Sequence, residues 1–191
     1  MDNILYNNDK ICNYIDSSSN FASLEFNSYF FDILTKYKTP FNNIIFLCIG
    51  SDRVTGDSLG PLVGYKLSKL PLKKDIFIYG TLENPVHAKN LKKTINEIYL
   101  NHKNPLLVVI DASLGSKEYI NYISIGEGGI KPGAGVNKNL PYIGDIYIKG
   151  IVNKTGLLEI SVLQNTRLYM VMNMADIISS GIWHCVNNLY F

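Results

Sequence analysis

The chain has 191 residues, enough for one globular domain that buries a core without disulfides or a structural metal. Its 18 basic and 16 acidic residues give a net charge of +2, too small to indicate a nucleic acid or a membrane surface as partner. The three cysteines form no CxxC pair and favour a reducing compartment. The sequence contains no membrane-length apolar run and no signal-like start, so we expect a cytoplasmic protein.

Residues 1–20 are polar and aperiodic apart from a small apolar island at Ile11, Tyr14 and Ile15, which predicts a loose N-terminal arm with one short helical turn. The remaining residues, 21–191, show no internal repeat and no linker, which indicates a single domain. Within that domain, apolar residues recur at helical spacing over 21–38 and predict a helix that ends before Pro40.

Strands and helices alternate through the middle of the chain. Continuous apolar runs predict buried parallel strands at 44–49, 76–79 and 106–110. Amphipathic helices are expected from Pro61 to Pro71 and over 91–99. This alternation predicts an α/β fold with right-handed parallel crossovers.

The pattern changes after residue 115. Two further strands are expected at 119–125 and 143–152, and 157–162 is a candidate for one more. The glycine-rich segment 126–136 has few side chains to pack, so it predicts a loop wrapped closely over a groove. Apolar positions over 163–185 predict a long closing helix.

Two aspartates follow the apolar strands. Asp57 lies in the turn that opens a helix, and Asp111 comes directly after 106–110. Ligands of open α/β sheets bind outside the carboxyl ends of the strands, so we expect both side chains in one cleft. The helix N-terminus favours the ionised form of Asp57, whereas the end of an apolar strand raises the pKa of Asp111. This inequality predicts a base and an acid, as an aspartic hydrolase requires.

Each aspartate also has an ordinary structural explanation. Asp57 has the position of a helix N-cap, and Asp111 that of a strand-end residue bonded to nearby backbone. A phosphate-binding loop is disfavoured, because no G-x-G-x-x-G or Gly-Lys-Ser/Thr sequence is present and Asp57 would repel a phosphate.

The histidines give little support for a metal. His87 follows the strand at 76–79 and is placed to reach the same cleft as a proton carrier or a ligand, although a lone histidine more often caps a helix. His102 lies among polar residues and is expected to be exposed, and His184 does not look like a ligand. No His or Cys pair has zinc spacing, so we assign no metal and no cofactor.

Several motifs carry a resemblance to known families. The segments GSDRVTGDSLGP at 50–61, PVHA at 85–88 and IDA at 110–112 resemble the YyaC family of bacterial sporulation proteins, a match that spans 44–185. The elements DSLGP and VIDA, with GIKPGAGV at 129–136, also resemble the germination protease, which degrades small acid-soluble proteins in germinating spores. The layout is more distantly similar to hydrogenase maturation endopeptidases.

The resemblance implies a three-layer α/β/α sandwich around a mostly parallel, mixed sheet, of the phosphorylase/hydrolase-like kind. It places Asp57 and Asp111 on the two aspartates proposed as catalytic in the germination protease. In the maturation endopeptidases the equivalent carboxylates help to hold a metal with a histidine, and no histidine here matches that position.

Our first hypothesis is a spore-associated peptidase of aspartic type, with Asp57 as base and Asp111 as acid. Its substrate would be a protein or peptide, small acid-soluble spore proteins among them. The alternatives are a non-enzymatic sporulation factor that keeps the fold to bind a partner protein, and a metal-dependent maturation-type endopeptidase. The 13 tyrosines and 8 phenylalanines are compatible with a homo-oligomer, although aromatic residues serve cores equally well. The residues expected to bind the substrate are His87, Gly129, Pro132, Gly133 and Gly135.

Overall fold

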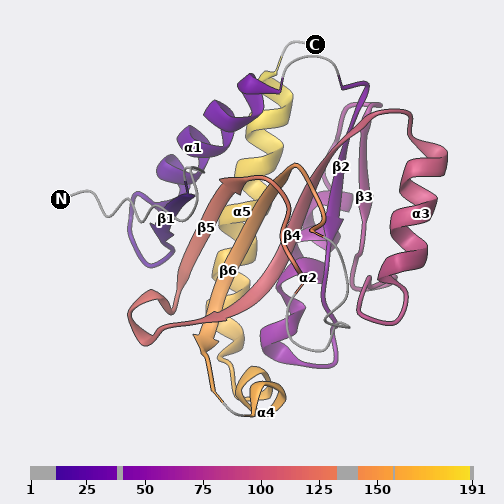
Figure 1. Cartoon of the computed structure of the whole chain (residues 1–191). Coiled ribbons are helices and arrows are strands. Elements are labelled where there is room, and N and C mark those ends of the chain that lie inside the picture. The colour runs from indigo at the N-terminus through magenta and orange to yellow at the C-terminus, as the bar shows by residue number, and fades with distance from the viewer. Residues whose placement is uncertain (1–11, 38–40, 133–141, 157, 190–191) are drawn as a thin grey trace.

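The computed structural model describes residues 12–37, 41–132, 142–156 and 158–189. A six-stranded sheet in the order β1-β5-β6-β4-β2-β3 forms its middle layer (Figure 1). The strands β2, β3, β4 and β6 are parallel, and β5 is antiparallel to both of its neighbours. The predicted α/β fold with a mostly parallel, mixed sheet is therefore confirmed. The strand bounds are β1 (Cys12–Asp16), β2 (Asn43–Cys48), β3 (Ile76–Tyr79), β4 (Pro105–Gly115), β5 (Tyr122–Glu127) and β6 (Ile146–Lys154).

Helices cover both faces of the sheet, which gives the expected three layers (Figure 1). One face packs against α1, α2 and α5, and α3 covers the other face over the β2–β3 half. No helix among the described residues is long and apolar enough to cross a membrane. The helical elements are α1 (Ala22–Lys36), η1 (Thr55–Ser58), α2 (Leu59–Ser68), α3 (Leu91–Asn101), η2 (Lys117–Tyr119), α4 (Glu159–Gln164) and α5 (Leu168–Asn188).

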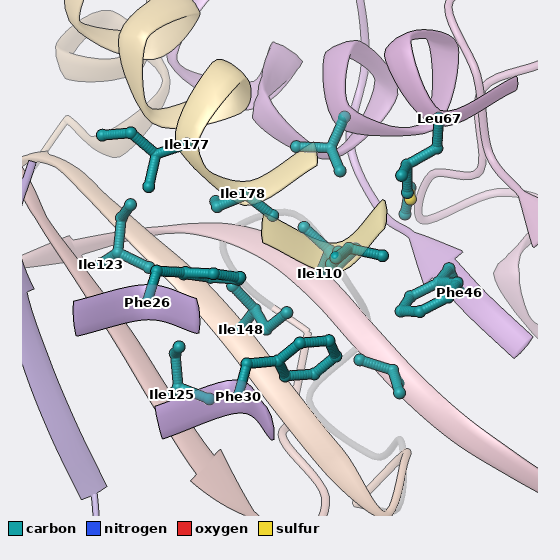
Figure 2. Packing of buried hydrophobic residues seen from close by; sticks show 14 of the residues in the cluster. Phe26, Phe30, Phe46, Leu67, Ile110, Ile123, Ile125, Ile148, Ile177 and Ile178 are labelled. Atoms are coloured by element: carbon teal, nitrogen blue, oxygen red, sulfur yellow. The ribbon is translucent and has the colours of Figure 1, made fainter. Parts of the chain in front are cut away.

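The larger core lies between the sheet and helices α1, α2 and α5. Figure 2 shows Phe26 and Phe30 of α1 packed beside Ile148 of β6. Each fully buried side chain of this size stabilises the fold by roughly 1.5–3 kcal/mol relative to an exposed one. Because β2 is covered by helices on both faces, all residues from Ile44 to Ile49 are buried. This double coverage explains why the strand appears in the sequence as a continuous apolar run.

The expectation of a loose arm over 1–20 is wrong for residues 12–16. These residues form β1, which pairs with β5 at the edge of the sheet and buries Ile15 completely. The strand is only five residues long, so it shows too little alternation for a period to be recognised. Residues 1–11 lie outside the described residues.

Three further expectations need correction. Residues 159–164 form the helix α4 instead of a strand, because a six-residue run is too short to distinguish the two periods. The strand expected from 119 begins at Tyr122, after the turn η2. The expected exposure of His102 is wrong: its ring packs on Phe77 with centroids 4.3 Å apart, and its Nε2 atom lies 2.9 Å from the Tyr79 hydroxyl.

Candidate functional site

A cavity of about 320 Å³ opens at the carboxyl ends of β2, β4 and β6. Asp57 borders it from the connection after β2, and Asp111 borders it from the last part of β4. His87, from the connection after β3, also lies in its wall. The cavity therefore lies where open α/β sheets bind their ligands, and both aspartates face it.

A short network of backbone contacts positions the Asp57 loop. The N–H of Ile49 donates to the Ile110 carbonyl at 2.7 Å, and the N–H of Gly50 donates to Val86 at 2.8 Å. The loop closes on itself, because the N–H of Ser51 donates to the backbone carbonyl of Asp57 at 3.0 Å. These bonds tie the loop to the neighbouring strand β4 and to the start of the His87 segment.

Glycine is required at position 50 in this network. Its φ angle is +143°, a conformation that other residues rarely adopt. A Cβ atom there would also collide with the backbone carbonyl of Asp57. Gly50 therefore lets the end of β2 approach the backbone that carries the Asp57 carboxylate.

The carboxylate of Asp57 lies in a partly desolvated position. Burial raises its pKa from 3.8 to about 6, and a hydrogen bond from the Ser51 backbone offsets part of the rise. From the sequence we expected the helix N-terminus to keep Asp57 ionised. Desolvation outweighs that effect, and Asp57 is not the N-cap either: Ser58 occupies that position of α2, without a side-chain capping bond.

Asp111 lies inside β4, which extends to Gly115, and not just after the strand as expected. Its side chain is buried, with 5% of its surface exposed. Strand alternation directs it to the same face of the sheet as Val109, which packs under α3. Its partner in register on β6 is Lys149, which places a lysine on the neighbouring strand of this face.

His87 is half-buried and held by the residues that precede α3. Its backbone N–H donates to Asn90 Oδ1 at 2.8 Å, and its Nδ1 atom accepts a hydrogen bond from the Lys89 N–H at 3.3 Å. Since Nδ1 accepts, the neutral ring carries its proton on Nε2. These contacts agree in part with the expectation that a lone histidine caps a helix. The His87 ring nevertheless borders the cavity.

The glycine-rich segment begins at the opposite end of the sheet. Gly128 donates from its N–H to the carbonyl of Asp145, which precedes β6, and Ile130 bridges to Ile143. Neither Gly129 nor Pro132 is among the residues that line the cavity. Gly133 and Gly135 lie outside the described residues. A role of these four residues in substrate binding stays a prediction.

Two polar residues of the cavity wall escaped the sequence reasoning. Thr155 and Glu159 follow the carboxyl end of β6, the strand beside β4. Residues that follow the carboxyl end of a parallel strand are candidates for the ligand site, so the position of Thr155 and Glu159 could have identified them. They were overlooked because residues 157–162 were interpreted as a strand. Glu159 adds a third carboxylate to the wall that already holds Asp57 and Asp111.

The donor set does not fit a metal centre. Over the described ranges, no three His, Cys, Asp or Glu side chains are grouped so that they could hold a metal ion. His87, Asp57, Asp111 and Glu159 border one cavity without forming such a group. We therefore derive no step through a metal.

A second hollow of about 610 Å³ adjoins the first, since both include His87 and Ala88 in their walls. The second hollow continues past Arg53 and Glu83. An extended ligand could follow this path, which an isolated small cavity would not allow.

Comparison of the sequence with known proteins identifies a family and a relative of this chain. The sequence model of the family described as "Protein of unknown function (DUF1256)" matches residues 14–181. The "Uncharacterized protein YyaC" of Bacillus subtilis (strain 168) is 53% identical over 139 residues, which cover 73% of this chain and 67% of that protein. The resemblance to YyaC is thus confirmed.

A solved structure with a similar fold is the [NiFe] hydrogenase maturation protease HycI from Thermococcus kodakarensis KOD1. The TM-score is 0.55 with 18% sequence identity, over 82% of this chain and 99% of that one. At this identity the likeness shows the fold alone. The chain therefore has a peptidase-like fold, while the link to spores and to the germination protease stays a prediction.

Proposed function

The chain belongs to the DUF1256 family, and on that premise we propose that it is a peptidase of aspartic type that cleaves a protein through Asp57 and Asp111. The observation that carries the proposal is that Asp57, from the connection after β2, and Asp111, from β4, line one cavity. The peptidase-like fold supports the same reaction class.

In the proposed reaction, Asp57 is the general base. A pKa of about 6 leaves the carboxylate mostly ionised at neutral pH and still basic enough to take a proton from water. The resulting hydroxide attacks the peptide carbonyl. Asp111, held protonated in this proposal, donates its carboxyl proton in a hydrogen bond to that carbonyl oxygen and so stabilises the charge that develops there. The proton held by Asp57 then passes to the leaving amine as the C–N bond breaks.

His87 is proposed to bind the substrate. Its Nδ1 atom is engaged by the Lys89 N–H, so Nε2–H is the donor left to a peptide carbonyl. Its position between the two hollows lets it contact an extended chain that runs from one to the other.

The finer proposal concerns the substrate. The resemblance of the DSLGP and VIDA elements to the germination protease suggests a spore protein, with small acid-soluble spore proteins as the first to test. In this proposal the enzyme acts in the cytoplasm of the sporulating cell or inside the spore.

The decisive experiment incubates the purified chain with small acid-soluble spore proteins and with casein, and identifies the cut bonds by mass spectrometry. Asp57→Asn and Asp111→Asn should each lower kcat/KM by about 100-fold or more, the usual contribution of a general acid or base. Asp32→Asn is the matched control, because Asp32 is an exposed aspartate of α1 that lines neither hollow. Parallel reactions with a chelator and with added divalent ions test the metal-dependent alternative.

Circular dichroism should show that the variants remain folded. If the wild-type chain cuts neither substrate under any of these conditions, the peptidase proposal fails and the non-enzymatic alternative gains support.

A further inference from the structure

The helix α4 has two unlike sides. Glu159 and Leu163, four residues apart and therefore on one side of the helix, line the cavity. Leu158 and Ile160, on or beside the same turn, are exposed by 73% and 66%. One short element thus joins the cavity wall to an apolar outer surface.

The first turn of α5, which follows α4 along the chain, carries two more exposed apolar side chains. Leu168 and Tyr169 are exposed by 57% and 78%, and Figure 1 shows α4 below the carboxyl end of β6, next along the chain to α5. We call Leu158, Ile160, Leu168 and Tyr169 together the α4 apolar surface. Singly exposed apolar side chains are ordinary, but a group of them beside a cavity is typical of a binding site.

The structure holds α4 firmly in this position. The Asn153 side chain on β6 donates hydrogen bonds to the Val162 carbonyl at 3.1 Å and to the Thr166 hydroxyl at 3.2 Å. Leu163 is buried and packs closely against Gly56 of η1. The exposure of Leu158 and Ile160 is therefore a property of an anchored helix.

We propose that the α4 apolar surface docks an apolar segment of the protein substrate, whose neighbouring peptide bond enters the cavity; this inference rests on the proposed function. Continuity is the argument, because any chain that covers Ile160 lies next to the cavity wall formed by Glu159. A second copy of this chain is the less suitable occupant. Stable protein dimers bury roughly 20–30 residues on each side, and the surface offers only four apolar side chains.

The substrate class follows from this geometry. A short polar peptide would occupy the cavity and leave the α4 apolar surface in water. A protein with an exposed or unfolded apolar segment gains binding energy from that surface as well. The site should therefore favour unfolded or extended protein segments that carry apolar side chains close to the scissile bond.

The test uses the full chain with Asp57→Asn, which keeps the cavity and removes the proposed base. A phage-displayed library of random 12-residue peptides is selected on this protein, and the enriched peptides are synthesised with a fluorescent label. Their affinity is then measured by anisotropy with and without the added pair Ile160→Ser and Tyr169→Ser. Loss of two apolar anchors should weaken binding by about tenfold or more.

Leu24→Ser in the same background is the matched control, because Leu24 is 66% exposed, like Ile160, but lies on α1. It should change the affinity by less than about twofold. Enriched peptides without apolar residues, equal affinity in the paired variant, or no enrichment at all would each overturn the docking proposal. So would a dimer in sedimentation velocity that the paired variant, but not Leu24→Ser, dissociates.

The two proposals fail in different ways. If selected peptides bind through the α4 apolar surface but the wild-type chain cuts nothing, docking stands and the peptidase proposal fails. If the wild-type chain cuts a protein and the paired variant has the same KM for it, the peptidase proposal stands and docking fails.

Discussion

The desolvation of the Asp57 carboxyl predicts how peptidase activity depends on pH. As a general base it must be ionised, and burial raises its pKa to about 6. The value of kcat/KM should therefore rise with pH and level off above about pH 6 to 7. A profile measured between roughly pH 4 and 8 checks this. An ascending limb near the ordinary pKa of 3.8 would contradict the role assigned to Asp57.

The same group should reduce the stability of the fold. Its folded-state pKa exceeds the ordinary value of 3.8, so the folded protein binds the proton more tightly than the unfolded chain does. Stability is then lost as pH rises from about 4 to about 6, and the full penalty remains above that range. The shift from 3.8 to about 6 corresponds to a loss of stability of about 3 kcal/mol without screening, and the partial exposure of this group reduces the expected loss to about 1–2 kcal/mol.

Asp57→Asn cannot ionise and should therefore raise the free energy of unfolding by about 1–2 kcal/mol at pH 8, with little change near pH 3.5. Urea denaturation at the two pH values measures the difference. Asp52→Asn, which removes an exposed carboxylate from the same loop, should change stability little at either pH. A loss of stability in Asp57→Asn at pH 8 would show that the carboxylate is a structural anchor.

At the scale of elements, the connection from β2 to α2 depends on Gly50. Gly50→Ala would adopt a strained φ of +143° and collide with the Asp57 carbonyl, so the loop must shift. We expect a loss of about 1–3 kcal/mol in the free energy of unfolding, together with lower activity because Asp57 moves. Gly156→Ala is the control, since its Cβ would meet only Val162 at 3.7 Å. Equal urea midpoints for the two variants would show that the loop adapts freely.

The accuracy of the sequence analysis differs from element to element for physical reasons. The strands β2 and β4 are buried on both faces, so their apolar runs alone identified them and placed Asp57 and Asp111 near their ends. The short helix α4 is stabilised by its contacts with Asn153 and with Gly56 of η1, and its own periodicity carries no such information. Glu159 was missed for that reason.

The surroundings of individual side chains could not be predicted for the same reason. His102 follows a polar stretch of sequence, yet Phe77 and Tyr79 of a distant strand enclose it. The pKa of Asp57 depends on how much water the folded loop excludes, and local sequence predicted only the opposing effect of a helix N-terminus. Both properties arise from contacts between segments that are far apart along the chain.

At the scale of the whole molecule, the N-terminal strand β1 shows the same limit most clearly. Nothing in the polar sequence around residues 12–16 indicates which strand edge it would cover. In the fold it pairs with β5, and the adjacent Ser17 accepts a hydrogen bond at its carbonyl from the Asn173 side chain of α5 at 2.8 Å. The beginning and the end of the described chain are thereby joined.

This joining can be tested through Ile15, the fully buried side chain of β1. Ile15→Ala removes apolar contacts with the core shared with α1 and β5, so we expect a loss of about 2–4 kcal/mol in the free energy of unfolding. The exposed Ile160 supplies the control, because Ile160→Ala makes the same chemical change and should cost less than about 0.5 kcal/mol. Urea denaturation with an unchanged m-value would assign the difference to the folded state. Equal stability of the two variants would mean that β1 behaves as a loose arm after all, and that the sheet is complete without it.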